Sequence, residues 1–166
     1  FLKKGVATTI VDEIVGAAGV AKGTFYVHFP SKEHLLAALQ QRFVTSYADL
    51  LQAAMDKRPA SDWRGRLRAW VTAGVNGYLD RVALHDVVFH EIHVDDRRLK
   101  HENTVVKRLA QFFEEGTRAG AWSVAAPRLT AVMLFSALHG AVDDTLAEGS
   151  AVNRKNLIRS LDEFSR

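Results

Sequence analysis

Residues 19–33 read GVAKGTFYVHFPSKE, and this stretch decides the fold. Its first part has helical spacing and ends at Pro30, although Gly23 and the β-branched residues around it are poor helix formers. A short helix built from such residues indicates that its outer face is shaped by something other than folding. The residues just before it indicate what that is.

Residues 9–28 have the spacing of a helix-turn-helix. The letters TIVD at Thr9 match an N-cap followed by an acid three residues on, which predicts a helix from about residue 9 to residue 17. Gly19 supplies the left-handed residue that a tight turn between two crossing helices requires. The second helix then covers about residues 21–28. We expect the small core between the two helices to contain Ile14, Ala18, Val20 and Phe25.

The outer face of the second helix suits the major groove of DNA. Gly23 removes a side chain where the backbone must approach closely, and a recognition helix enters the groove by its N-terminal end. Lysine and threonine can reach base edges, whereas tyrosine, histidine and a lysine at the start of the next helix can hold phosphates. The predicted DNA contacts are Thr9, Lys22, Gly23, Thr24, Tyr26, His28 and Lys32.

The stretch TTIVDEIVGAAGVAKGTFYVHFPSKEHLLAAL, residues 8–39, resembles the DNA-binding region of the TetR family of transcriptional regulators. The shared pattern covers about residues 1–43: a glycine closing the first helix, T-T, A-A-G-V at the turn, K-G-T-aromatic-Tyr, and F-P-S-K-E. The resemblance supports the same DNA contacts and implies an all-α domain behind them with a ligand pocket and a dimer interface. Val15, Ala21 and Val27 depart from the usual residues, which affects the operator sequence rather than the assignment.

The remainder of the chain reads as helical. Apolar residues recur at spacings of three and four without sustained strand alternation, which predicts an all-α fold. About nine helices are expected, over approximately residues 1–4, 9–17, 21–28, 31–56, 62–79, 84–94, 101–118, 127–146 and 152–164.

Two domains are expected from this order of helices. Residues 1–45 form a helix-turn-helix DNA-binding domain of three helices, and residues 46–166 form a ligand-binding and dimerisation domain. The opening letters FLKKGV read as the end of a helix whose beginning is missing, so the first helix is expected to be truncated and the chain incomplete.

Composition fits a DNA-binding protein of the cytoplasm. The chain has 166 residues, 48% of them hydrophobic and 25% charged, with a net charge of +3 that weakly favours an anionic partner. The absence of cysteine excludes disulfides and thiolate metal sites and is compatible with a reducing compartment. No apolar run approaches the roughly 20 residues that cross a bilayer, so no membrane partner is expected.

The helix expected over residues 127–146 is apolar nearly all round and must therefore be covered on both sides. We expect a homodimer in which the last two helices form a four-helix interface, with burial inside one chain as the alternative. A dimer also supplies the two-fold symmetry that reads a pseudo-palindromic operator in double-stranded DNA. The interface candidates are Leu129, Val132, Phe135, Ala137, Gly140, Ala141, Leu157, Leu161 and Phe164.

A pocket for an unidentified small molecule is expected among the helices between residues 62 and 146. Gly74 and Gly77 make room inside a helix, either for a ligand or for a closely packed helix. Polar members among aromatic ones would orient a mainly apolar ligand, although aromatic residues at helical spacing also serve as core. The pocket candidates are Trp70, Asn76, Tyr78, Phe89, His93, Phe112, Trp122 and His139.

The letters HEIHVDD at residues 90–96 fail the H-E-x-x-H zinc pattern, because the second histidine is at position 93. His90 and His93 could still bind a metal with Asp95, Asp96 or His139, but solvated or core histidines are favoured. No catalytic motif is present, so no enzyme activity, catalytic residue, metal or cofactor is expected.

The sequence thus predicts a DNA-binding transcriptional regulator, a repressor that a small molecule releases from its operator. One alternative is a dimeric DNA-binding regulator whose C-terminal domain only dimerises. A distant alternative is a metal-binding helical enzyme that uses His90 and His93.

Overall fold

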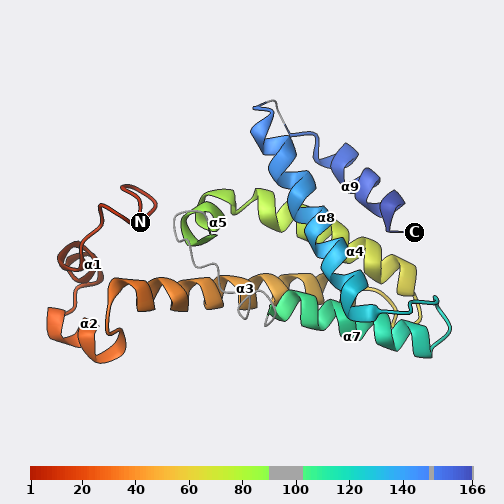
Figure 1. Ribbon diagram of the computed structural model, residues 1–166, viewed down its shortest axis with the longest axis horizontal. Helices are drawn as coiled ribbons and strands as arrows, with labels where there is room; N and C mark the ends of the chain where they lie inside the picture. The colour runs from red at the N-terminus through yellow and green to blue at the C-terminus, as the bar shows by residue number, and fades with distance from the viewer. Residues whose placement is uncertain (90–102, 150–151, 166) are drawn as a thin grey trace. The chain divides into compact units, whose positions relative to one another are not determined.

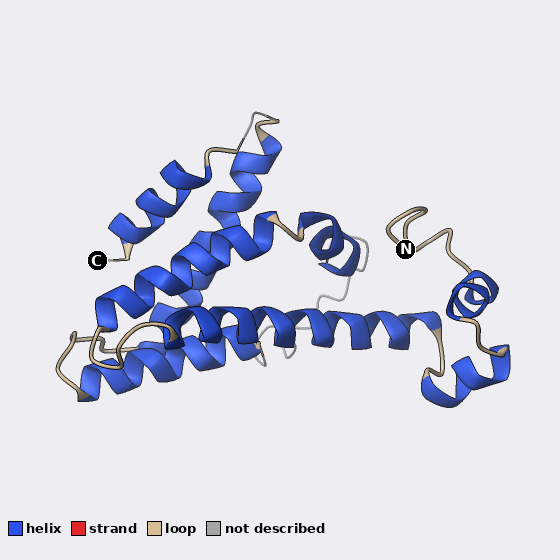
Figure 2. Ribbon diagram, turned by 180° about the vertical axis from the view of Figure 1, so that it is seen from behind, coloured by secondary structure: helices blue, strands red, loops and turns tan. Residues whose placement is uncertain are grey.

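The computed structural model describes residues 1–89, 103–149 and 152–165 (Figure 1). Within these ranges every regular element is an α-helix (Figure 2), and none of these helices is long and apolar enough to span a membrane. The predicted all-α class is therefore confirmed. The helices are α1 (Val11–Ala18), α2 (Lys22–His28), α3 (Lys32–Asp56), α4 (Trp63–Leu79), α5 (Val82–Phe89), α7 (Thr104–Arg118), α8 (Pro127–Ala147) and α9 (Arg154–Phe164).

The helix predicted over residues 1–4 is the main difference between the predicted and the observed helices. Residues 1–8 form two turns, and the amides of Lys4 and Gly5 donate to the carbonyl of Phe1 at 3.1 and 2.7 Å. Gly5 then adopts a left-handed backbone with φ of 80°, which ends the turn. One turn fixes several dihedral angles for very few hydrogen bonds, so these residues do not propagate a helix.

Polar caps begin several of the later helices. The side chain of Asp62 accepts from the Gly65 amide at 2.9 Å, which confirms the predicted start of α4. Asn103 caps α7 and Asn153 caps α9 by accepting hydrogen bonds from amides of the first turn. Each cap satisfies an amide that the helix itself leaves unpaired.

Contacts divide the chain into two compact units. The first contains residues 1–43 and α5, and the second contains residues 44–80 together with α7, α8 and α9. The predicted division at residues 45 and 46 lies next to the end of the first unit, but it assigned α5 to the C-terminal domain. No local pattern in the sequence indicates that α5 packs with the first unit.

Side-chain contacts explain why α5 joins the first unit. Gln40 of α3 donates to the carbonyl of Val88 at 2.5 Å. The ring of Phe43 lies against those of His85 and Phe89, with centroid distances of 6.0 and 5.8 Å. These contacts attach α5 to the first half of α3.

In the second unit, the two glycines of α4 leave room for side chains of α8 and α3. A side-chain carbon at Gly74 would collide with Leu138, and one at Gly77 would collide with Leu50 and crowd Tyr47. The buried Tyr47 hydroxyl donates to the carbonyl of Gly74 at 2.7 Å. Of the two predicted uses of these glycines, the structure therefore supports a closely packed helix rather than room for a ligand.

Three glycines of the helix-turn-helix allow a test of the turn. Gly19 has φ of +66°, whereas Gly16 and Gly23 are helical, and a side chain at any of the three would point into open space. We expect Gly19→Ala to destabilise the first unit by about 1–2 kcal/mol, because L-residues resist the left-handed conformation.

The matched control is Gly16→Ala, which we expect to stabilise α1 by about 0.5–1 kcal/mol through helix propensity. Thermal unfolding combined with hydrogen exchange of the α1 amides measures both changes. Equal effects of the two substitutions would contradict the assigned turn.

Candidate nucleic-acid interface and ligand cleft

The core between α1 and α2 is small. Val15 and Phe25 are the buried members, and Ile14 is half-buried. Ala18 and Val20 are exposed, so the expectation that they belong to this core is wrong. The core is centred on the middle turn of α1. Ala18 in the last turn and Val20 after Gly19 remain at the surface.

The outer face of α2 is open along its length. Tyr26 and Val27 are 49% and 80% exposed, and no atom lies within 4 Å of the position that a side chain at Gly23 would occupy. The remaining predicted contacts of this helix, Lys22, Thr24 and His28, are also exposed. This face therefore presents a shallow surface with polar and aromatic groups and no obstruction at its N-terminal end.

Lys22 is paired in the free protein. Its ammonium lies 2.7 Å from the Asp12 carboxylate of α1, and this contact raises the pKa of Lys22 above its ordinary value. Lys22 therefore stays charged. Because exposed ion pairs contribute little stability, a phosphate can replace Asp12 as its partner.

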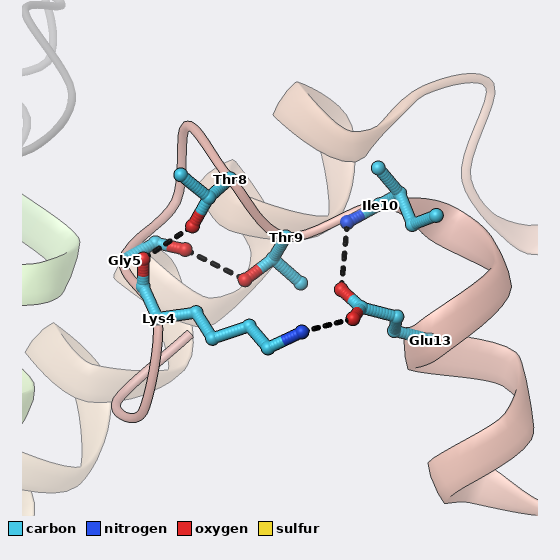
Figure 3. Close-up of polar contacts among 6 residues, drawn as sticks. All are labelled: Lys4, Gly5, Thr8, Thr9, Ile10 and Glu13. Carbon is cyan, nitrogen blue, oxygen red and sulfur yellow. Dashed lines mark hydrogen bonds and ion pairs between the residues drawn. The ribbon is translucent and has the colours of Figure 1, made fainter.

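The segment before α1 is held by a chain of polar contacts, drawn in Figure 3. The Lys4 ammonium contacts the carboxylate of Glu13, and the other oxygen of Glu13 accepts from the amide of Ile10 at 3.3 Å. The lysine contact, followed by this amide, holds the pKa of Glu13 below its ordinary value. Glu13 thus joins the N-terminal segment to the first turn of α1.

Thr9 differs from its predicted roles. Its side chain is 6% exposed, and its hydroxyl donates to the carbonyl of Gly5 at 2.6 Å. The residue that precedes α1 as its N-cap is Ile10 rather than Thr9. A buried hydroxyl with an internal partner cannot reach a phosphate, so the structure argues against Thr9 as a DNA contact.

Lys32 lies where the N-terminal segment meets α3. Its ammonium donates to the carbonyls of Val6 and Thr9 at 2.7 and 3.0 Å, and the side chain is partly buried. An ammonium has three donor hydrogens, so one remains for a phosphate. The sequence predicted only the phosphate contact and missed this attachment of the segment that precedes α1.

The predicted pocket residues do not line one cavity. Trp70, Tyr78 and Phe112 are each at most 4% exposed, and Phe89 belongs to the first unit. His93 lies outside the described residues.

The structure brings four of the candidates together in two pairs, with the ring of Phe112 5.2 Å from that of Trp122 and the ring of His139 near that of Tyr78. Asn76 accepts from Arg154 at 3.2 Å. The ring of His139 lies 5.1 Å from that of Tyr78, whose hydroxyl donates to Asp143 at 2.5 Å. Several of these residues pack as core, and a single pocket that all of them share stays a prediction.

A cleft of about 660 Å³ does open in the second unit. It lies among α4, the segment between α7 and α8, α8 and α9, and Trp122 is the only predicted pocket residue in its wall. The Trp122 indole donates to the carbonyl of Phe113 at 2.9 Å. The lining residues are Arg64, Leu67, Arg68, Phe113, Ala121, Trp122, Ser123, Val124, Thr130, Met133, Leu134, Asp162, Phe164 and Ser165.

Helix α8 has a buried face and an exposed apolar face. The buried residues recur at helical spacing and are Ala131, Leu134, Leu138 and Val142. On the other face, Leu129, Val132 and Met133 are 57%, 37% and 51% exposed. A helix that keeps an apolar face in water is typical of an interface.

The interface candidates differ in accessibility. Leu129, Val132, Gly140 and Phe164 are exposed, whereas Phe135, Ala137, Ala141 and Leu157 are partly buried. Leu161 is 5% exposed because it packs inside its own chain, which argues against an interface position for it. The periodicity of α9 marks an apolar stripe but does not say which neighbour covers it.

The proposed metal-binding histidines, His90 and His93, lie outside the described residues, as do Asp95 and Asp96. Over the ranges that the structure describes, no group of three or more histidine or acidic side chains could hold a metal ion. The remaining candidate, His139, makes a contact of 3.1 Å between its Nδ1 and the carbonyl of Phe135.

Known proteins resemble the N-terminal region most clearly. The family described as bacterial regulatory proteins, tetR family, matches residues 1–39. The chain is 46% identical over 44 residues to the uncharacterized HTH-type transcriptional regulator YerO of Bacillus subtilis, which covers 26% of this chain and 15% of YerO. It is 34% identical over 83 residues to the HTH-type transcriptional regulator EthR of Mycobacterium tuberculosis, which covers 50% of this chain and 37% of EthR. The matches therefore span well under half the length of these relatives.

The fold of the whole chain also has counterparts. The transcriptional regulator FadR from Bacillus subtilis, solved in complex with stearoyl-CoA, superposes with a TM-score of 0.78 at 19% identity. The similarity covers 99% of this chain and 90% of that one. The resemblance to the TetR family is thus confirmed: residues 1–39 match the model of that family, and the chain as a whole shares its fold with FadR.

The attachment made by Lys32 yields a prediction. We expect Lys32→Met to destabilise the first unit by about 2 kcal/mol, because two carbonyls lose a charged donor in a partly buried site. Urea unfolding followed by circular dichroism measures this change. Lys57→Met, which removes an exposed lysine of the second unit, is the control and should leave stability nearly unchanged. If both variants unfold at the same urea concentration, the ammonium of Lys32 has no structural role.

Proposed function

We propose that this chain is a TetR-like transcriptional regulator that binds a pseudo-palindromic operator in double-stranded DNA as a homodimer. The observation that carries the proposal is the face of α2. It combines an unobstructed Gly23 with exposed Lys22, Thr24, Tyr26 and His28 inside a family-specific helix-turn-helix. The relatives named above, both of them transcriptional regulators, support it, and a protein that binds operator DNA acts in the cytoplasm.

The contacts divide into two kinds. Lys22, Gly23 and Thr24 occupy the first turn of α2, the end that enters a major groove and meets base edges. Tyr26 and His28 lie further along the exposed face, where phosphates flank the groove. The free donor of Lys32 adds a phosphate contact at the start of α3. Thr9 is left out because its hydroxyl is buried.

Dimer formation is supported by the exposed face of α8. Leu129, Val132 and Met133 lie in successive turns, and Gly140 further along allows a second helix to approach closely. Two copies related by a two-fold axis would bury this face against itself. Such a dimer presents two recognition helices to half-sites about 34 Å apart.

Release by a small molecule requires a connection between the two units, and α3 is the natural candidate. It is a continuous helix of 25 residues that carries Lys32 at its start and Tyr47 within the second unit. A ligand that prefers one packing of the second unit around α3 would shift the spacing of the recognition helices. The coupling cannot exceed the ligand's difference in affinity for the two states. We propose that the outcome is repression relieved by ligand.

A regulator whose second unit only dimerises is the competing proposal. It is favoured by the observation that most predicted pocket residues are packed in the core. The comparison with FadR, whose structure contains stearoyl-CoA, and the open cleft favour a ligand instead. Sites selected from random DNA, followed by a screen for compounds that release the selected site, distinguish the two.

The recognition surface is tested by adding bulk at Gly23. We expect Gly23→Val to abolish operator binding, at least 100-fold weaker, while leaving the unfolding temperature almost unchanged, because the new side chain points into open space. Gly16→Val adds the same side chain to an equally open site on α1 and should bind normally. Electrophoretic mobility shifts on the selected operator measure both. Wild-type affinity for Gly23→Val would refute the assignment of α2 as recognition helix.

The dimer is tested by charge on the exposed face of α8. We expect Val132→Glu to convert the dimer to monomers, because two carboxylates would meet near the two-fold axis in an apolar contact. Ala53→Glu, at an exposed position of α3, carries the same charge and should remain dimeric. Analytical ultracentrifugation gives the masses, and an unchanged dimer for Val132→Glu would show that α8 is not the interface.

A further inference from the structure

Many of the side chains that line the cleft in the second unit are apolar. Among them, Leu67 and Leu134 are almost completely buried, and Trp122 is partly buried. Met133 and Phe164 are 51% and 66% exposed. Its volume of about 660 Å³ falls within the range of small-molecule sites, which is roughly 300–1,000 Å³.

Two arginines line the same cleft. Arg64 and Arg68 are four residues apart on α4 and therefore lie one turn apart on one side of the helix. The guanidinium of Arg68 is paired with Asp162 of α9, with nitrogen–oxygen distances of 3.1 and 3.2 Å. Within the described part of the chain, Arg64 has no ion-pair or hydrogen-bond partner.

The acidic side chain in the wall is already neutralised. Asp162 is 16% exposed and faces Arg68, so the net charge of the lining residues is +1 and belongs to Arg64. A guanidinium presents a planar set of donors that matches a carboxylate, and such charge-assisted bonds are the strong ones. The cleft therefore offers one anion-binding group beside a continuous apolar wall.

From this juxtaposition we infer that the cleft binds an amphipathic monocarboxylate, with its carboxylate on Arg64 and its hydrocarbon part against Leu67, Trp122 and Met133. An uncharged hydrocarbon leaves Arg64 without a partner, and a cation is repelled by it. The inference names the ligand class for the proposed regulator, but binding to the cleft does not itself require DNA.

The Arg68–Asp162 pair gives the site a second property. It joins α4 to the C-terminal part of α9 at the wall of the cleft, while Arg154 joins the other end of α9 to Asp80 at 2.7 Å. A carboxylate that binds beside Arg68 competes with Asp162 for that guanidinium. Ligand binding is thereby expected to loosen the C-terminal end of α9, next to the proposed dimer face of α8.

The experiment is calorimetric titration of the full chain, without DNA, with sodium decanoate, decanol and decyltrimethylammonium below their micelle concentrations. We expect saturable binding of decanoate at one site per chain, at least tenfold weaker binding of decanol, and no binding of the cation. Equal affinities for all three would overturn the inference, because they would show an apolar surface without charge recognition. No binding of decanoate would overturn it as well.

Three variants locate the site. Arg64→Gln is expected to weaken decanoate binding about tenfold, and Arg64→Lys to restore part of the loss, because the charge returns without the planar donors. Asp162→Asn is expected to strengthen binding several-fold, because it releases Arg68 and removes a carboxylate from the wall. Arg42→Gln, at another exposed arginine without a partner in the described residues, should bind decanoate like the wild type.

The alternative to a small-molecule ligand is that a second copy of the chain covers the cleft. If Arg64→Gln changes the dimer mass in ultracentrifugation and leaves decanoate binding unchanged, the cleft belongs to the interface and the inference is wrong. Operator binding is measured separately on the same variants. If the wild-type chain binds its operator but not decanoate, only the ligand class is rejected, whereas failure of operator binding by the wild type rejects only the proposed regulator.

Discussion

One unbroken helix, α3, is the constraint on which both compact units depend. It supplies Leu36 and Phe43 to the core of the first unit and Tyr47 and Leu51 to the core of the second. Its polar side chains attach neighbouring segments through their backbones, at Val6 and Thr9 by Lys32 and at Gly74 by Tyr47. A hydrogen bond to a backbone carbonyl holds a segment in place independently of the side chains of that segment. A break in α3 would separate these attachments.

The hairpin of α1 and α2 combines a small apolar core with polar contacts. Between α1 and α2 only Val15 and Phe25 are buried, so little apolar area stabilises this hairpin. Lys4, Glu13 and Lys32 join the N-terminal segment to α1 and α3, in addition to the buried cluster that Val6 forms with Leu36 and Val87. The outer face of α2 stays exposed, because the core of the hairpin lies on its other side. The hairpin is therefore sensitive to the loss of single polar groups.

The second unit uses the opposite solution, with aromatic and aliphatic packing throughout. Gly74 makes room for Leu138 of α8, Gly77 makes room for Leu50 of α3, and Gly116 makes room for the indole of Trp122. The cleft of this unit lies among α4, α8, α9 and the segment between α7 and α8. Met133 lies both in that cleft and on the exposed face of α8, so the proposed ligand site and the proposed dimer face share this residue.

The sequence by itself determined the class of fold, the helix-turn-helix and the face of α2, because these depend on local spacing, turn chemistry and a series of residues in register. As predicted, Gly19 makes the turn, Phe25 is buried in the core, and α4 begins next to Asp62. Tertiary structure alone decided that Thr9 is buried, that Leu161 packs inside its own chain and that Lys32 holds carbonyls.

The tertiary structure also decided that the aromatic residues expected in one pocket pack in several places. Arg64 and Phe164, which are distant in sequence, line one cleft. Periodicity shows that a side chain faces something, but the identity of that neighbour depends on how helices far apart in the chain pack together.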